Sequence, residues 1–174
     1  PLNPDVSVVG LYPEESNVFK STLSPLLITF KTSEGRRYPM LFKVGDDLRQ
    51  DQLVIQIIIL MDRLLQKENL DLKLTPYRIL ATSATAGAVQ FIPSISLSAA
   101  SAKYKSILAY LQANNPDDNE PLGVRKETMD TYIKSCAGYC VITYLLGVGD
   151  RHLENLLLAP DGHFFHADFG FILG

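Results

Sequence analysis

The spacing of apolar residues in this chain of 174 residues changes near Pro93, and the two patterns predict different structures. Before Pro93, short runs rich in β-branched side chains alternate with turn residues, a pattern typical of strands. We predict five strands, at residues 6–11, 26–31, 38–44, 77–83 and 88–92. Because the first three runs are joined by short links, they should form an antiparallel meander. A turn around Ala86 and Gly87 should join the last two strands.

Longer runs follow a helical period. Residues 49–67 carry apolar side chains on almost every face, so they should form one long helix that is buried against the strands. After the change in pattern we predict helices at residues 97–112 and 127–146, and short strands at residues 156–158 and 164–167. The sequence therefore predicts an α+β fold, with strands mainly in the first half and helices mainly in the second.

Composition excludes several classes of protein. Hydrophobic residues make up 47% of the chain and charged residues 20%, which is typical of a packed globular core. The net charge of −3 argues against a nucleic-acid binder. The longest apolar run, residues 53–61, is too short to span a bilayer, so any work at membranes should be done from the water side. Cys136 and Cys140 are expected to be reduced, buried thiols, which fits a cytoplasmic protein.

A polar loop and a later Asp-Phe-Gly carry the residues with catalytic potential. Asp150 and Asn155 stand five apart in the loop, and Asp168 follows across a short hairpin. Phosphoryl transfer needs a group that handles the proton of the attacking hydroxyl, and oxygen ligands that hold Mg²⁺ on the phosphates. Protein kinases have the same separation of Asp and Asn, although here the order is Asp-Arg-His instead of His-Arg-Asp. A lone Asp-Phe-Gly could be a surface turn, but the combination favours an ATP- and metal-dependent phosphotransferase.

Lys43 lies inside an otherwise apolar predicted strand. A buried cation is costly unless it is paired, and an ATP phosphate together with the carboxylate of Asp51 would pair it. The alternative is a lysine at a strand edge that reaches water. Residues 19–25, in the polar loop between the first two strands, lie where a phosphate-covering loop would lie, but a solvated hairpin is the default interpretation.

The three histidines are interpreted differently. His152 lies inside the polar loop and could accept a proton or stabilise the transferring phosphoryl group, because histidine titrates near neutral pH. Whether Asp150 or His152 takes the proton stays open. His166 is interpreted as a core histidine that fixes the nearby loop, and His163 as an exposed residue beside a turn.

Five stretches of the chain resemble one enzyme superfamily. Residues 42–51, 149–155 and 166–170 are similar to the phosphatidylinositol 3-kinase superfamily, and residues 67–77 and 135–144 more narrowly to its class III, vacuolar-sorting type. The resemblance implies a protein-kinase-like bilobal α+β fold. Its N-lobe would be residues 1–93, with five antiparallel strands and one long helix. Residues 94–174 would be the first, mainly helical part of a C-lobe that is cut before the activation loop.

The resemblance also implies roles for individual residues. The residues implied for ATP are Ser21, Lys43, Asp51, Tyr77, Gln90, Phe91 and Ile92. Lys43 and Ser21 would contact phosphates, and Asp51 would lie in the same pocket. Tyr77 would line the adenine pocket, and residues 90–92 would form the hinge. Asp150 and His152 would serve the catalytic step, while Asn155 and Asp168 would bind Mg²⁺, with Mn²⁺ as an alternative.

The activity implied is phosphoryl transfer from ATP to the 3-hydroxyl of phosphatidylinositol, giving phosphatidylinositol 3-phosphate in endosomal sorting and autophagy. Thr22 and Leu23 stand where enzymes that act on phosphorylated lipids carry basic residues, which favours the unphosphorylated lipid. The partners implied are phosphatidylinositol in membranes, a regulatory protein-kinase-like subunit and autophagy scaffold proteins, but no nucleic acid. The enzyme would be cytoplasmic and peripheral on endosomal and autophagic membranes. Because the chain stops at Gly174, it is expected to be inactive alone.

Two other functions are carried as alternatives. A protein Ser/Thr kinase of the same superfamily would share the Asp-Arg-His and Asp-Phe-Gly motifs. A nucleotide-binding or interaction module without catalysis is the third possibility. The presence of Lys43, Asn155 and Asp168 together argues against this third possibility, because inactive kinases usually lose one of them.

Overall fold

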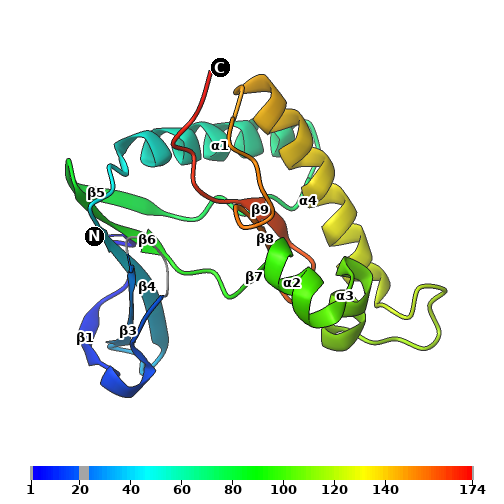
Figure 1. Cartoon of the computed structure of the whole chain (residues 1–174), viewed down its shortest axis with the longest axis horizontal. Helices are drawn as coiled ribbons and strands as arrows, with labels where there is room; N and C mark the ends of the chain where they lie inside the picture. The colour runs from blue at the N-terminus through cyan, green and yellow to red at the C-terminus, as the bar shows by residue number, and fades with distance from the viewer. Residues whose placement is uncertain (1, 20–23, 174) are drawn as a thin grey trace. The chain divides into compact units, whose positions relative to one another are not determined.

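The computed structural model describes residues 2–19 and 24–173 (Figure 1). The chain divides into two compact units. The first comprises Pro1–Gln56 and Tyr77–Ile92, and the second comprises Ile57–Pro76 and Pro93–Gly174. The last boundary lies next to the one expected between two lobes. Residues 57–76, expected in the first lobe, instead belong to the second unit.

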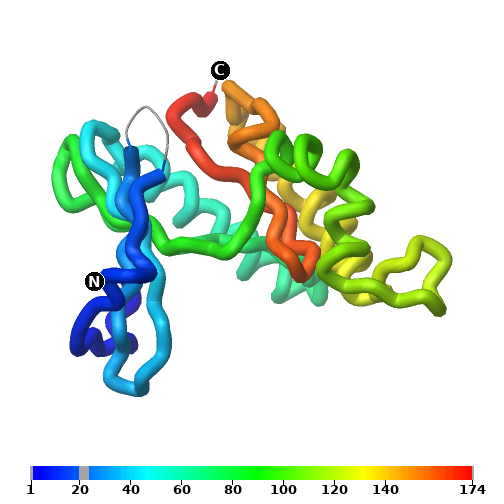
Figure 2. The backbone as a smooth tube through the Cα atoms, turned by 60° about the horizontal axis from the view of Figure 1, so that its bottom comes forward, coloured from blue at the N-terminus to red at the C-terminus, as the bar shows by residue number. Residues whose placement is uncertain are grey.

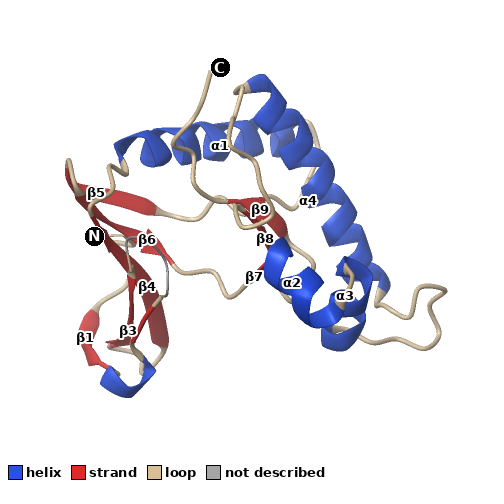
Figure 3. Cartoon of the chain, in the orientation of Figure 1, coloured by secondary structure: helices blue, strands red, loops and turns tan. Residues whose placement is uncertain are grey.

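The first unit is built on an antiparallel sheet, shown in red in Figure 3. Its strands are β1 (Val8–Leu11), β2 (Asn17–Val18), β3 (Leu26–Thr32), β4 (Arg37–Val44), β5 (Ile79–Ser83) and β6 (Ala86–Gln90). The order is β1-β3-β4-β6-β5, with β2 paired to β3 and a 3-10 turn, η1 (Pro13–Glu15), before β2. The expected meander is confirmed. The expected number of five strands is wrong, since the described residues form six: the two residues of β2 are too few to show alternation.

Gly87 lies inside β6, contrary to the predicted turn, which falls instead at Ala84 and Thr85. A Cβ atom at position 87 would lie 2.7 Å from the carbonyl oxygen of Leu80 and 2.8 Å from Cδ1 of Leu48. Glycine inside a strand often marks such a close approach. Tight packing against β5 and Leu48 therefore explains this glycine, and a turn does not.

The long helix α1 (Arg49–Lys67) has the predicted bounds and crosses from the first unit into the second between Gln56 and Ile57. Its burial is one-sided. Val54 and Ile58 are fully buried, but three leucines are more than half exposed: Leu53, Leu60 and Leu64. Part of the apolar surface of α1 is therefore exposed, although its apolar side chains lie on almost every face.

The second unit also contains three further helices and a small antiparallel sheet within its described residues (Figure 3). The helices are α2 (Leu97–Tyr104), α3 (Ile107–Asn114) and α4 (Lys126–Leu145), and the strands are β7 (Ile95–Ser96), β8 (Leu156–Leu158) and β9 (Phe164–His166), in the order β7-β8-β9. The single helix predicted at residues 97–112 is wrong. Lys105 ends α2 with a left-handed φ of 72°, and the Ser106 hydroxyl then caps α3 by accepting a hydrogen bond from Ala109 N.

Helix α4 packs on β9, the strand that leads into Asp-Phe-Gly (Figure 2). Ser135 is fully buried in α4, and its Oγ accepts a hydrogen bond from Phe164 N at 2.9 Å and donates to Thr131 O at 2.7 Å. One turn later, the hydroxyl of Tyr139 accepts a hydrogen bond from Thr75 N at 3.3 Å. The Ser135–Phe164 bond fixes α4 against β9, and the Tyr139–Thr75 bond fixes it to the segment that ends at Pro76, so together they fix the point at which the loop after α4 begins.

Cys136 and Cys140 are free thiols on α4. Burial raises the pKa of the Cys136 thiol, with Cys140 as a further cause, so it stays protonated near neutral pH. Cys140 is exposed, and the prediction that both thiols are buried is wrong for this residue. Among the helices formed by residues 2–19 and 24–173, none has the length and apolar character that crossing a membrane requires.

Candidate active site

The loop with the predicted catalytic residues starts where α4 ends. Gly147 turns the chain with a φ of 54°. Two backbone hydrogen bonds then join this loop to the segment after Asp-Phe-Gly: Gly149 N donates to Phe171 O at 2.9 Å, and Leu173 N donates to Leu146 O at 3.0 Å. The two segments therefore lie side by side, although the β8–β9 hairpin separates them in sequence.

Asn155 and Asp168 lie at the same end of that hairpin. Leu156 pairs with His166, and Ala167 N donates a hydrogen bond to Asn155 O at 2.9 Å. Antiparallel pairing thus continues past the ends of both strands. The structure brings together these two predicted metal ligands, of which Asn155 is buried and Asp168 is exposed.

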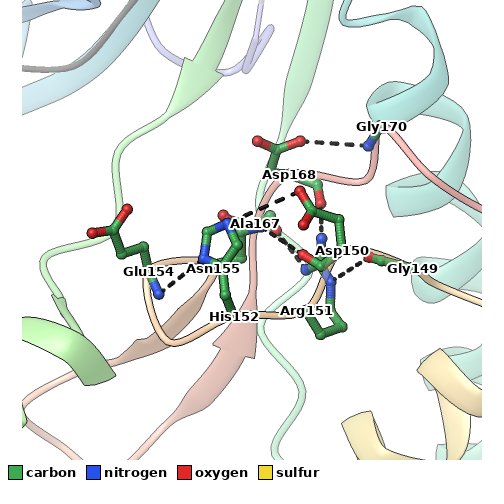
Figure 4. Close-up of polar contacts among 9 residues, drawn as sticks. All are labelled: Gly149, Asp150, Arg151, His152, Glu154, Asn155, Ala167, Asp168 and Gly170. Carbon is green, nitrogen blue, oxygen red and sulfur yellow. Dashed lines mark hydrogen bonds and ion pairs between the residues drawn. The ribbon is translucent and has the colours of Figure 1, made fainter.

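Asp150 and Asp168 both have left-handed backbone conformations, with φ values of 49° and 60°. This region is uncommon for residues with a Cβ atom, although Asp and Asn enter it more often than most. Figure 4 shows both carboxylates, and that of Asp168 accepts a hydrogen bond from Gly170 N at 3.4 Å. Such conformations persist where the surroundings hold them, and they concentrate at functional sites.

Arg151 holds backbone groups on both sides of the site (Figure 4). Its Nε donates to Gly149 O at 2.9 Å, and its Nη1 donates to Ala167 O at 2.8 Å. Its Nη2 donates to Asp168 O. The guanidinium carbon also lies 5.7 Å from the ring centroid of Phe169, which is fully buried. One side chain therefore connects the catalytic loop to Asp-Phe-Gly.

His152 and Asp150 lie next to each other, with 3.9 Å between His152 Nε2 and Asp150 Oδ2, and both side chains are about half exposed. The other ring nitrogen, Nδ1, accepts a hydrogen bond from Glu154 N at 3.3 Å. In a neutral imidazole one nitrogen accepts while the other carries the proton. The acceptor role of Nδ1 therefore puts the proton on Nε2, the nitrogen that faces Asp150.

The donor atoms around Asn155 and Asp168 fit a hard cation. The Nδ2 group of Asn155 donates to Asp150 O at 3.0 Å, which leaves its Oδ1 as an oxygen donor for a cation. No group of three or more His, Cys, Asp or Glu residues in the described ranges could hold a metal. Mg²⁺ does not require one, because it commonly binds through one or two protein oxygens together with substrate phosphates.

His166 is a buried histidine, as interpreted from the sequence. Its ring stacks on Tyr139, with 5.3 Å between the centroids and 12° between the planes. Its Nδ1 has no hydrogen-bond partner within the described parts of the chain. Burial, and then the charge of Arg151, lower the pKa of His166 to about 4, so the ring is neutral near pH 7.

Lys43 lies in β4 of the first unit, directly opposite Gly87 of β6. Its Nζ donates to Asp46 Oδ2 at 3.1 Å, and its side chain is 25% exposed. Lys43 is thus paired with a carboxylate three residues later. The pairing with Asp51, which is buried in the first turn of α1, stays a prediction.

The remaining residues predicted for ATP also belong to the first unit, apart from Ser21, which lies outside the described residues. Tyr77 is buried just before β5. Gln90 ends β6, where its backbone N donates to Arg78 O at 2.8 Å and its side-chain Oε1 accepts from Arg78 N at 3.0 Å. Phe91 and Ile92 follow, half-buried. The structure therefore gathers the predicted catalytic and metal residues in one unit and the described ATP residues in the other.

Two residues near these groups receive no role from the sequence, Arg151 and Asp46. Arg151 lies inside the motif, but its hydrogen-bond acceptors are backbone carbonyls, which no pattern of side chains reveals. Asp46 has a weak signal, because it is a carboxylate three residues from a lysine whose strand is otherwise apolar. That spacing could have suggested the pair with Lys43.

Comparison with known proteins agrees with the resemblance read from the sequence. The family described as phosphatidylinositol 3- and 4-kinase matches residues 37–105 and 96–174. Phosphatidylinositol 3-kinase VPS34 of Saccharomyces cerevisiae is 63% identical over 174 residues, and phosphatidylinositol 3-kinase pik3 of Schizosaccharomyces pombe is 63% identical over 178 residues. Phosphatidylinositol 3-kinase VPS34 of Arabidopsis thaliana is 57% identical over 175 residues. The expected similarity to the class III enzymes is confirmed.

These matches cover 100% of this chain but only 20%, 22% and 22% of the three relatives. The chain therefore spans about a fifth of the length of the curated relatives it matches.

Proposed function

Because this chain belongs to the phosphatidylinositol 3- and 4-kinase family, we propose that it supplies the ATP- and metal-binding part of a lipid kinase. The reaction is transfer of the γ-phosphoryl group of ATP to the 3-hydroxyl of phosphatidylinositol, giving phosphatidylinositol 3-phosphate. One observation carries the proposal: Asn155 Nδ2 donates to Asp150 O, and the N–H of Ala167, next to Asp168, donates to Asn155 O, so hydrogen bonds within a single loop and hairpin hold the three residues in one place. That arrangement offers a proton acceptor and two oxygen ligands, which are the groups that phosphoryl transfer requires.

In this proposal Asp150 takes the proton of the attacking hydroxyl. Its carboxylate can only accept, whereas His152 already carries a proton on the nitrogen that faces it. The role of His152 is then to donate its Nε2–H toward the transferring phosphoryl group. Positioning of this kind accounts for most of the catalysis in phosphoryl transfer, because the protein does little covalent chemistry itself.

Asn155 and Asp168 would hold the metal through Oδ1 and the carboxylate. Bound there, Mg²⁺, or Mn²⁺ in its place, would neutralise charge on the phosphates. In the first unit Lys43 would contact the phosphates, exchanging its pair with Asp46 for a phosphate oxygen. Tyr77 and residues 90–92 would surround the adenine, with the Gln90 carbonyl and the Ile92 N–H facing it.

The finer parts of the proposal rest on family resemblance. The two units would correspond to the two lobes of a protein-kinase-like fold. Thr22 and Leu23, in place of basic residues, favour the unphosphorylated lipid. A regulatory protein-kinase-like subunit and autophagy scaffold proteins would bring the enzyme to endosomal and autophagic membranes, where it would act in sorting and autophagy.

Turnover of radiolabelled ATP on phosphatidylinositol vesicles by the full-length enzyme tests the proposal. Asp168→Ala should reduce kcat at least about 100-fold, because it removes a metal ligand and its transition-state charge stabilisation. Asp118→Ala, in an exposed loop, is the matched control and should keep wild-type turnover. Unchanged turnover of Asp168→Ala would contradict the assignment. Phosphorylation of protein in place of lipid would favour the Ser/Thr kinase, and ATP binding without any turnover would favour the non-catalytic module.

A further inference from the structure

We propose that Arg151 is a positioning residue that sets the direction of both carboxylates of the candidate active site. The inference rests on the proposed phosphoryl transfer for its kinetic consequences. Its structural basis is independent of the reaction, because it follows from hydrogen bonds between one guanidinium and three backbone carbonyls (Figure 4).

The peptide groups on either side of Asp168 are both held by Arg151. Nη1 donates to the carbonyl of Ala167, which precedes the Asp168 nitrogen, and Nη2 donates to the carbonyl of Asp168 itself. Fixing both peptide planes fixes φ and ψ between them. Because the Cα–Cβ bond follows from φ and ψ, Arg151 sets the direction in which the Asp168 side chain leaves the backbone.

The peptide groups around Asp150 are held in a similar way by two side chains. Nε of Arg151 donates to the carbonyl of Gly149, and Nδ2 of Asn155 donates to the carbonyl of Asp150. Asp150 and Asp168 are both left-handed, a conformation that residues with a Cβ atom avoid unless the surroundings hold it. Arg151 contributes to holding both.

Arginine is the side chain suited to this role. Its planar guanidinium presents N–H groups in a fixed fork that can meet carbonyls in several directions at once. Lysine would keep the positive charge, but its single ammonium nitrogen cannot occupy the three positions of Nε, Nη1 and Nη2. The ring of Phe169 lies under the guanidinium and restricts it further. Arg151→Lys therefore removes the geometry of the guanidinium fork while it keeps the positive charge.

The first measurement is steady-state kinetics of the full-length enzyme on phosphatidylinositol vesicles at a series of free Mg²⁺ concentrations. Arg151→Lys should lower kcat roughly 10- to 100-fold, as loss of groups that orient metal ligands commonly does. The Mg²⁺ concentration that gives half-maximal rate should rise several-fold, while KM for the lipid stays within about twofold. Arg125→Lys, at the other end of α4 and exposed, is the matched control and should behave as wild type.

The second measurement is amide hydrogen exchange without metal or nucleotide. In Arg151→Lys the amides of Gly149, Ala167 and Gly170 should exchange at least about tenfold faster, since their acceptors lie in the segments that Arg151 connects. The amides of α4 should keep their wild-type rates. This result does not depend on the reaction.

Three results would overturn the inference. One is wild-type kinetics and wild-type exchange in Arg151→Lys. Another is faster exchange that extends through α4, which would indicate general destabilisation. The third is lower kcat with unchanged Mg²⁺ dependence and unchanged exchange. If the wild-type enzyme itself did not phosphorylate the lipid, the proposed function would fail, whereas local exchange in Arg151→Lys would still decide whether Arg151 positions the two aspartates.

Discussion

The two aspartates of the candidate active site, Asp150 and Asp168, both have left-handed backbone conformations. The proximity of Asn155 and Asp168 could be predicted from the sequence, because a short hairpin between them brings its own ends together whatever its details. The backbone conformations of the two aspartates could not be predicted. Neither could the role of Arg151, since its acceptors are main-chain oxygens that every residue possesses.

His166 makes stability depend on pH in the metal-free and nucleotide-free enzyme. The pKa of the folded residue is lowered to about 4 from 6.5. Between these values the unfolded chain binds a proton that the folded chain does not. The free energy of unfolding should therefore fall as the pH falls through this window, by roughly 3 kcal/mol in total.

Urea unfolding of the catalytic domain between pH 4 and pH 7 measures this dependence, with His166→Phe as the comparison. Phe keeps an aromatic ring beside Tyr139 but has no proton to bind, so its pH slope should be smaller in this window. Equal slopes for the wild type and His166→Phe would show that His166 does not cause the effect.

At the scale of elements, a helix or strand could be predicted where it was long enough for its apolar residues to show a period. The bounds of α1 could be predicted because the helical period continues over its 19 residues. The break between α2 and α3 could not, because Lys105 and Ser106 have no strong helix-breaking character and the left-handed φ of Lys105 is a local choice of backbone. The two residues of β2 give no period at all. The exposed leucines of α1 show that an apolar pattern does not determine how many faces are covered.

Gly87 provides a test of how tightly β5 and β6 pack. Gly87→Ala should lower the free energy of unfolding by about 1–3 kcal/mol, because its Cβ would meet the backbone oxygen of Leu80 and the side chain of Leu48. Gly10→Ala is the matched control in β1 of the same sheet, where a Cβ would have no neighbour within 4 Å. Chemical denaturation of the catalytic domain measures both, and equal effects of the two substitutions would contradict the packing argument.

At the scale of the whole molecule, the predicted site residues are divided between two units that the chain enters more than once. It passes between them at Gln56 and Ile57, at Pro76 and Tyr77, and at Ile92 and Pro93. The last crossing lies at the change in sequence pattern near Pro93. The first two could not be predicted, because α1 continues through one of them without any break in its period.

Lys43 tests whether the first unit contributes to ATP chemistry. Lys43→Met should lower kcat/KM for ATP by roughly 100-fold or more in the full-length enzyme, because a cation that stabilises phosphate charge is lost. KM for the lipid should change little. Lys31→Met, exposed on β3, is the control and should leave kcat/KM for ATP unchanged. A Lys43→Met enzyme with wild-type kinetics would remove Lys43 from the proposed ATP site.

The three crossings matter for anyone who wishes to divide the protein into complementing fragments. A cut at Ile92 and Pro93 follows the change in sequence pattern and would be the obvious choice for a split reporter. It would leave residues 57–76 on the same fragment as the sheet, although they belong to the other unit. This segment contains Thr75, whose amide donates a hydrogen bond to the Tyr139 hydroxyl of α4. The helical fragment would lose part of its own packing, so the two pieces should depend on each other to fold and should be poorly suited to separate expression.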